Sequence, residues 1–287
     1  MFRALLMIGF SFSFSLRAEQ NWYPVDVQAD GKPLQYQPLQ KVTKVWRLCA
    51  LLPHGKDHYW WGVSWGLAEE AKRQGVQLGI YEAGGYENLS RQRKQLQDCV
   101  SNKADALIIA AISSEGLNDL ILQLKNAGIP VIDLINGMKS QAITARSSAS
   151  FADMAAKSIQ YLLKHNQQQN AILAWFPGPV QAAWVQDAER GLKQELQGSP
   201  LQLVHGGYGA TDNFSQATLV RQLFGHQQPN YVLANAVAAG VTQHFISAEN
   251  LTSDGLLRQS RGSAADPKRS VAGGSNRFAS DPGPHQY

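Results

Sequence analysis

The sequence contains 287 residues, of which 44% are hydrophobic and 17% are charged, and its formal net charge is +4. This length is sufficient for two α/β lobes, each with its own core. The small positive excess forms no basic stripe with interleaved aromatic residues, which argues against a nucleic-acid partner.

The amino terminus has the pattern of a secretory signal. A positive start, Met-Phe-Arg, is followed by an apolar run from Ala4 to Leu16 and by a small residue, Ala18. We therefore predict a signal peptide over residues 1–18 and export to the periplasm, with a buried amino-terminal strand as the alternative. No later run approaches the roughly 18 apolar residues of a membrane-spanning helix.

The next segments predict an extended arm and a first α/β lobe. Residues 19–43 contain three prolines and no sustained hydrophobic period, which indicates the arm. Residues 44–136 alternate apolar runs with helical patterns, so we expect a doubly wound parallel sheet. Its expected strands are 44–52, 76–81, 106–111 and 130–135, and its expected helices are 62–74, 88–100 and 114–126.

The second half repeats this alternation. Residues 137–150 are polar and predict a hinge crossing between lobes, and residues 151–251 predict a second lobe. Its expected helices are 151–165, 184–196, 213–224 and 237–248, and its expected strands are 171–176, 201–205 and 231–234. Residues 252–287 are rich in Ser, Gly, Arg, Asp and Pro and have no apolar period, so we expect a disordered tail.

Aromatic residues follow the first two strands of the first lobe. Tyr59 and Trp60 come after the first strand, and Tyr86 comes after the second. Ligands of open α/β sheets bind beyond the carboxyl ends of the strands. The pattern therefore predicts a small-ligand site walled by aromatic rings. As an alternative, Tyr59 and Trp60 contact a partner or pack against the arm.

The neighbouring residues receive structural assignments. We expect Trp61 and Trp65 to pack in the core, Trp175 to lie in the core of the second lobe, and Asp57 to cap the following helix. His54 and His58 lack metal-ligand spacing, and the sequence shows no catalytic set and no cofactor motif. We therefore expect a protein that is not an enzyme and that needs no cofactor or metal.

The two cysteines are Cys49, on the first strand, and Cys99, near the end of the second helix. They are compatible with one disulfide in an oxidising compartment, and two buried free thiols are the alternative.

Several motifs resemble the type I periplasmic binding proteins, the family of ribose-binding protein and of the LacI-type regulator core. The resemblance covers about residues 40–251, and the most specific part combines Lys-Asp-x-Tyr-Trp with Glu-Ala-Gly-Gly-Tyr. The matching segments are 48–53, 56–60, 82–86, 176–179 and 236–239. The resemblance is to members that sense trimethylamine N-oxide together with a membrane sensor histidine kinase, so it implies that ligand and that partner.

This resemblance also assigns roles to residues of both lobes. Tyr59 and Trp60 would form one wall of the ligand site, Tyr86 would donate to the oxide oxygen, and Phe151 and Trp184 would enter from the second lobe. Aromatic faces hold methylated cations, each with about 0.5–2 kcal/mol when desolvated.

Three alternatives to this function remain, and the third depends on the carboxyl-terminal part of the chain. A sugar-binding protein of an ABC importer would share the fold, whereas an exported enzyme would need clustered acid–base or metal-binding residues. Family members continue beyond the last expected helix, and the tail from Thr252 resembles nothing in them. The third alternative is therefore a truncated or frameshifted, non-functional product with an incomplete second lobe and an unpaired edge at the strand over 231–234.

Overall fold

The computed structural model describes residues 24–29, 32–166, 168, 170–254 and 271–272, and it divides into two units between Thr43 and Lys44. The first unit contains an antiparallel hairpin of β1 (Val25–Ala29) and β2 (Lys32–Tyr36). The sequence between these strands is Asp-Gly, which is a strong hairpin signal. The predicted arm therefore contains paired strands, and the predicted signal peptide lies outside the described residues.

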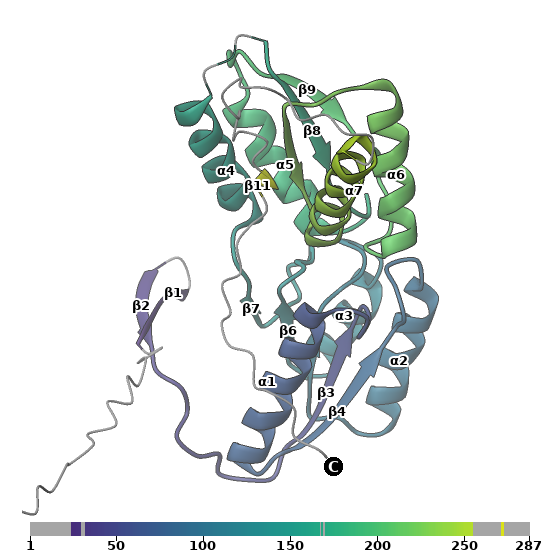
Figure 1. Ribbon diagram of the computed structural model, residues 1–287. Coiled ribbons are helices and arrows are strands. Elements are labelled where there is room, and N and C mark those ends of the chain that lie inside the picture. The colour runs from purple at the N-terminus through teal and green to yellow at the C-terminus, as the bar shows by residue number, and fades with distance from the viewer. Residues whose placement is uncertain (1–23, 30–31, 167, 169, 255–270, 273–287) are drawn as a thin grey trace, which may run out of the picture. The chain divides into compact units, whose positions relative to one another are not determined.

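The first lobe is built on a five-stranded parallel sheet with the order β4-β3-β5-β6-β7. Its strands are β3 (Arg47–Leu52), β4 (Gln77–Glu82), β5 (Ala106–Ile109), β6 (Val131–Leu134) and β7 (Ala145–Ser147). Its helices are α1 (His58–Gln74), α2 (Leu89–Ser101) and α3 (Asn118–Asn126). Helices α2 and α3 cover one face of this sheet, and α1 packs on the other (Figure 1).

Local signals explain where α1 begins and ends. The Asp57 carboxylate caps the helix by accepting the backbone N–H of Trp60 at 2.9 Å, as the sequence predicts. The helix ends at Gly75, whose φ of 70° lies in the left-handed region that glycine tolerates best. The Asp57 cap thus fixes the first turn of α1, with its aromatic residues, at the end of the loop that follows β3.

Strand β7 lies inside the predicted hinge crossing, over residues 137–150. Its three side chains are all exposed, so they leave no apolar pattern in the sequence. Asp133 of β6 and Arg146 of β7 form an ion pair of 2.7 Å, and Asp133 also accepts the N–H of Met138 at 2.8 Å. These polar contacts join β7 to the sheet.

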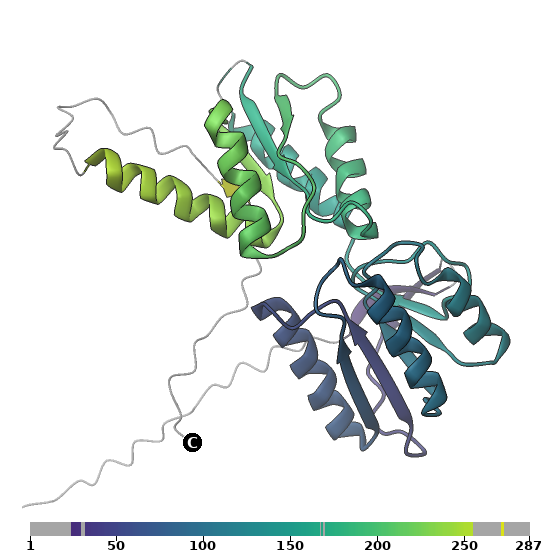
Figure 2. The same ribbon diagram turned by 90° about the vertical axis from the view of Figure 1, so that its right-hand side faces the viewer.

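The second lobe has a sheet with the order β11-β10-β8-β9, and all its pairings are parallel. Its strands are β8 (Ile172–Phe176), β9 (Gln202–His205), β10 (Tyr231–Ala234) and β11 (Val271–Ala272). Its helices are α4 (Phe151–His165), α5 (Ala183–Glu195), α6 (Asn213–His226) and α7 (Ala236–Asp254). One core cluster joins α4 and α5 to the sheet, and another joins α6 and α7 to it, so the helices form two layers (Figures 1 and 2).

The carboxyl-terminal part differs from the sequence expectation in two places. Helix α7 continues to Asp254, past the predicted start of the tail. Strand β11 pairs with Val232 and Leu233, so the expected unpaired edge of β10 is wrong for these two residues. The remaining residues of the predicted tail lie outside the described residues.

Two further features bear on the sequence expectations. Cys49 of β3 and Cys99 of α2 form a disulfide with their Cα atoms 6.2 Å apart. Within the described residues, none of the helices has the length and apolar character needed to span a membrane. The predicted architecture of two α/β lobes is confirmed by the sheet topology.

Candidate ligand-binding site

Six rings follow one another in an aromatic row, which we define as Tyr59, Trp60, His54, Tyr86, Trp184 and Phe151. Successive ring centroids in this order lie 5.3, 6.1, 5.8, 6.4 and 5.8 Å apart. The first four rings belong to the first lobe, and the last two belong to α5 and α4 of the second. The row therefore brings together all five aromatic residues that the sequence analysis selects, and it adds His54.

The rings of the first lobe come from the segments that follow the carboxyl ends of β3 and β4. Tyr59 and Trp60 lie in the first turn of α1, whose start is fixed by Asp57. Trp60 is buried against Leu52 and Ala110, whereas Tyr59 is 44% exposed. Trp60 is therefore a fixed wall, and Tyr59 lies at the solvent side of the row.

Tyr86 is the most buried tyrosine of the row, with 5% of its surface exposed. Its hydroxyl donates to Asn136 Oδ1 at 3.3 Å, and Asn136 Nδ2 donates to the carbonyl of Ala111 at 2.9 Å. Burial raises the pKa of Tyr86 far above the ordinary tyrosine range, against smaller opposing effects of Asn136 and Trp184. Tyr86 therefore stays protonated, and its proton is directed at Asn136.

Trp184 lies in the first turn of α5 and reaches the first lobe. It packs against a buried cluster that includes Tyr86, Ile112 and Val185. A side chain at Gly178 would meet the Trp184 ring at 2.8 Å, so this glycine makes room for the indole. Within the described residues, Trp184 Nε1 is buried and has no hydrogen-bond partner. This buried N–H lies beside the Tyr86 hydroxyl, whose pKa it helps to lower, but it makes no hydrogen bond of normal geometry.

His54 also belongs to the row, although the sequence analysis treats it only as a histidine without metal-ligand spacing and does not expect it at the ligand site. It follows β3 directly, is 2% exposed, and lies between Trp60 and Tyr86. Burial lowers the pKa of its imidazole, so the ring is neutral at pH 7. The only sequence signal was its place at a strand end, because a single histidine carries no motif.

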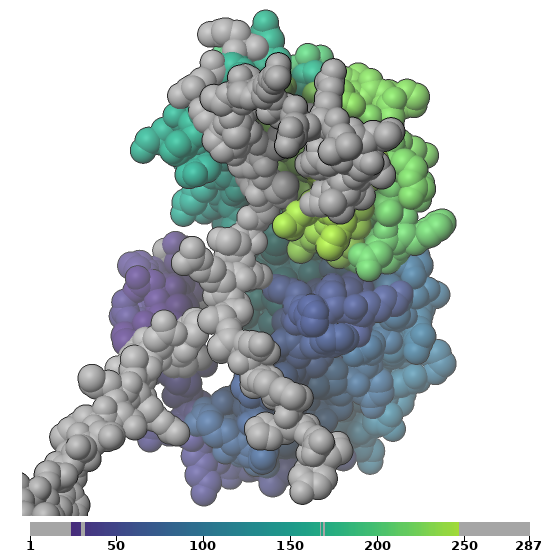
Figure 3. Space-filling view, in the orientation of Figure 1, coloured from purple at the N-terminus to yellow at the C-terminus, as the bar shows by residue number. Residues whose placement is uncertain are grey.

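The tryptophans next to the row behave differently from expectation. Trp61 is 53% exposed and Trp65 is 68% exposed, so their predicted place in the core is wrong. Both side chains therefore lie on the solvent side of α1. The surface of this helix is visible in Figure 3. Trp61 Nε1 donates to the carbonyl of Gly55 at 2.7 Å. Trp175 lies in the core of the second lobe, as the sequence analysis expects.

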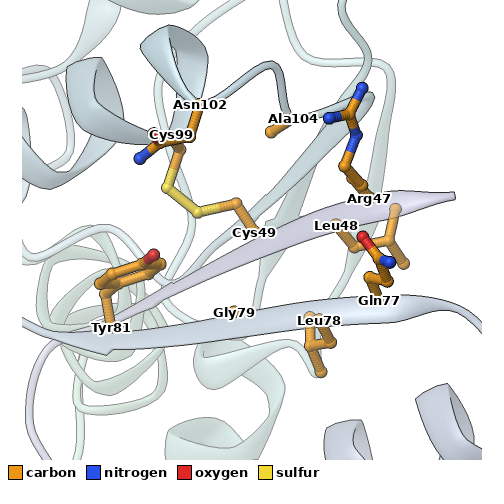
Figure 4. Close-up of a pocket in the computed structure, with 10 residues that line it drawn as sticks. All are labelled: Arg47, Leu48, Cys49, Gln77, Leu78, Gly79, Tyr81, Cys99, Asn102 and Ala104. Carbon is orange, nitrogen blue, oxygen red and sulfur yellow. A yellow bond between two sulfur atoms is a disulfide. The ribbon is translucent and has the colours of Figure 1, made fainter.

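A separate cavity of about 220 Å³ lies beside the disulfide of the first lobe (Figure 4). Its walls come from β3, β4 and the carboxyl end of α2, and they include Cys49, Gly79, Tyr81, Cys99 and Asn102. None of the residues that the sequence analysis selects for ligand binding lines it. Among the described residues, no group of three or more His, Cys, Asp and Glu side chains is arranged to hold a metal.

Residues 49–254 match the model of the family described as periplasmic binding protein domain. Together with the two α/β lobes and the aromatic row, this match shows that the chain belongs to that family. Its members bind solutes without catalysing a reaction, which agrees with the expectation that the protein is not an enzyme.

Among individual proteins, the chain is similar to the periplasmic protein TorT of Escherichia coli strain K12, with 32% identity over 202 residues. The alignment covers 69% of this chain and 58% of TorT, so the chain spans less than two thirds of this relative. A solved TorS sensor domain–TorT complex in the presence of TMAO (trimethylamine N-oxide) matches with 25% identity and a TM-score of 0.61, covering 73% of this chain and 71% of that one.

A second solved structure is also similar. It is an ABC transporter solute binding protein from a Bradyrhizobium species with bound Bis-Tris, at 41% identity and a TM-score of 0.62. The match covers 81% of this chain and 73% of that chain.

Proposed function

We propose that this chain is a periplasmic solute-binding sensor that binds trimethylamine N-oxide and signals to a membrane sensor histidine kinase of the TorS type. The observation that carries the proposal is the aromatic row together with the buried donor Trp184 Nε1, which makes no hydrogen bond of normal geometry within the described residues. The export signal predicted over residues 1–18 supports a place in the periplasm.

The chemistry of the row suits a small methylated amine oxide. This ligand has three methyl groups on a positively charged nitrogen and one negatively charged oxygen. Aromatic faces attract such a cation, with about 0.5–2 kcal/mol for each desolvated ring. Tyr86 of the first lobe and Trp184 of the second lobe have ring centroids 6.4 Å apart. A cation held beside them would contact rings from both lobes.

The oxide oxygen needs a hydrogen-bond donor. The sequence analysis assigns this role to Tyr86, but the Tyr86 proton is already donated to Asn136 Oδ1. Trp184 Nε1 is a buried donor without a partner within the described residues, and a buried N–H of this kind costs about 1–3 kcal/mol until it is paired. We therefore assign the oxide oxygen to Trp184 Nε1, with Tyr86 as a wall of the site.

The proposed partner rests on the relatives. TorT is present with the TorS sensor domain in the solved complex that resembles this chain, so a related sensor domain is the proposed partner here.

A second candidate is a solute-binding protein that delivers its ligand to an ABC importer. It is favoured by the Bradyrhizobium protein, which is 41% identical and is described as a transporter component. Bis-Tris, which is bound to that protein, is a tertiary amine that carries several hydroxyl groups. Its binding is therefore compatible with either a methylated amine or a polyol as the natural ligand.

A thermal unfolding experiment separates these candidates. The chain exported to the periplasm is melted alone and with trimethylamine N-oxide, ribose or Bis-Tris. A ligand that binds the native state raises the midpoint, by an amount that grows with the logarithm of its concentration once this exceeds Kd. We expect a rise with trimethylamine N-oxide and none with ribose. A rise with ribose alone would support the importer, and a transition that is not cooperative would support the non-functional product.

A further inference from the structure

A polar contact joins the two lobes at the middle of the aromatic row. His54 Nε2 lies 3.4 Å from Thr211 Oγ1, and these residues are far apart in the sequence. His54 follows β3 of the first lobe, whereas Thr211 precedes α6 of the second. Asp212 fixes the position of Thr211, because its carboxylate caps α6 by accepting the N–H of Ser215 at 2.8 Å.

The hydrogen bond at Nδ1 sets the tautomer of the His54 imidazole. The backbone N–H of Lys56 donates to His54 Nδ1 at 3.3 Å, so Nδ1 carries no proton. The proton of the neutral ring is therefore on Nε2, which donates it to Thr211 Oγ1. A protonated imidazole has N–H groups on both nitrogens, so it would lose the bond from Lys56.

We propose that His54 and Thr211 form a pH-sensitive latch that closes the two lobes around the ligand only while the imidazole is neutral. The proposal rests on the proposed solute-binding function and adds a regulation of that site. His54 is a positioning residue in it, since it holds Trp60 and Tyr86 apart and reaches the other lobe.

The surroundings of His54 determine how strongly protonation opposes closure. Its ring is almost fully buried between Trp60 and Tyr86, which disfavours the charged form. Lys56 also disfavours it, whereas three carboxylates favour it, namely Asp57, Glu82 and Glu87. From the second lobe, Asp212 lies near enough to Lys56 to interact with it electrostatically. Burial outweighs the carboxylates, so the closed form binds fewer protons than the open form.

The sign of the pH effect follows from this difference. When the lobes open, water reaches the Nε2 side of His54 that Thr211 covers in the closed form, while Trp60 and Tyr86 of the same lobe stay beside the ring, so its pKa rises toward the ordinary histidine value of about 6.5. Closure then requires loss of a proton below that pH, so the closed form is favoured at pH 7.5 and weakened as the pH falls. We expect the affinity for trimethylamine N-oxide to fall by up to about tenfold between pH 7.5 and pH 5.5.

Two substitutions of His54 separate the roles of its ring nitrogens, and a third changes the partner residue Thr211. His54→Asn keeps an acceptor near Nδ1 for the Lys56 N–H but removes the Nε2 donor. His54→Gln keeps a donor near Nε2 but cannot be protonated. Thr211→Val removes the acceptor with little change in shape.

The experiment measures lobe closure without ligand. The native cysteines are joined in the disulfide, so nitroxide labels attach only to cysteines introduced at the exposed positions Glu69 and Arg221. Electron-resonance distance distributions are recorded at pH 7.5 and pH 5.5. We expect acid to increase the open population of the otherwise unsubstituted chain and to leave His54→Gln unchanged. His54→Asn and Thr211→Val should be more open at pH 7.5.

The result that overturns the latch is an equal acid response in His54→Gln and the unsubstituted chain, or an unchanged distance in Thr211→Val. Titration of trimethylamine N-oxide at both pH values is carried out in parallel. If this compound fails to bind at pH 7.5, the proposed ligand is wrong, and the distance measurement still decides the latch. Circular dichroism of each variant shows that it is folded before its distances are interpreted.

Discussion

Tyr86 donates its hydroxyl proton to Asn136 Oδ1, at 3.3 Å, and both side chains are buried. The orientation of Asn136 is itself fixed, because its Nδ2 group donates to the carbonyl of Ala111. The Tyr86 hydroxyl therefore presents lone pairs, and not its proton, to a ligand in the aromatic row. In the proposed site, Tyr86 is therefore a wall of the pocket, and Trp184 is the donor to the ligand.

Trp184→Phe is expected to weaken binding of trimethylamine N-oxide about tenfold. The substitution keeps an aromatic face but removes the N–H that we assign to the oxide oxygen, and one hydrogen bond is worth about 1.4 kcal/mol in such a site. Isothermal titration calorimetry measures the change. Trp65→Phe is the matched control, because Trp65 is 68% exposed and should leave the affinity unchanged. Equal affinities for both variants would contradict the role of Trp184.

Tyr86→Phe is expected to act mainly on stability. It leaves the buried Asn136 Oδ1 without its donor, which should lower the free energy of unfolding by about 1–2 kcal/mol. Urea unfolding measures this change, and the ligand affinity should fall less than in Trp184→Phe. A larger loss of affinity in Tyr86→Phe would return the donor role to Tyr86.

Gly191→Ala is expected to destabilise the second lobe by several kcal/mol. Gly191 lies on α5 where this helix packs closely on α4, and an added methyl group would clash with the backbone carbonyl of Ala152. Backbone atoms cannot move aside as a flexible side chain can, so the two helices would have to separate. Thermal and urea unfolding measure the effect.

Gly66→Ala is the control for this substitution. Gly66 lies inside α1, and a methyl group there meets no atom within 4 Å. Alanine is the better helix former by about 1 kcal/mol, so this variant should be slightly more stable than the unsubstituted chain. Destabilisation of similar size in both variants would show that the contact between α4 and α5 is unimportant.

Removal of the disulfide is expected to lower the free energy of unfolding by about 2–4 kcal/mol. The bond links residues separated by 50 positions, so it restricts the unfolded chain considerably. The paired variant Cys49→Ala with Cys99→Ala is compared with the unsubstituted chain in urea, with and without dithiothreitol. Reducing agent should destabilise the unsubstituted chain and leave the paired variant unaffected. No difference between the chains would contradict a stabilising bond.

Hydrophobic periodicity predicted most of the elements, because buried strands and amphipathic helices leave a clear pattern. The strand at 231–234 and the helix at 151–165 have the predicted bounds. Strand β7 could not be predicted this way, since its residues are exposed. Strands β1 and β2 lie in a segment with no sustained apolar period, so the sequence analysis predicted an extended arm there and not the hairpin that the Asp-Gly pair between the strands favours.

The candidate site was predictable only in part, because side-chain direction depends on tertiary packing. Strand-end position selected Tyr59, Trp60 and Tyr86, but it could not show that the adjacent Trp61 points outward. Helix α1 carries aromatic residues on more than one side, so its sequence did not reveal which side faces the sheet. His54 was missed because its contacts with Trp60 and Thr211 exist only in the folded chain.

The disulfide encloses part of the binding machinery within one covalent ring. His54, Tyr59, Trp60 and Tyr86 all lie between the two bonded cysteines. Every first-lobe member of the aromatic row is thus carried on a loop that is tethered at both ends, while Phe151 and Trp184 lie outside it. In a reducing environment the rings of the first lobe would lose this covalent constraint, whereas Phe151 and Trp184 of the second lobe would be unaffected. Oxidative maturation after export would then become a condition for ligand recognition as well as for stability.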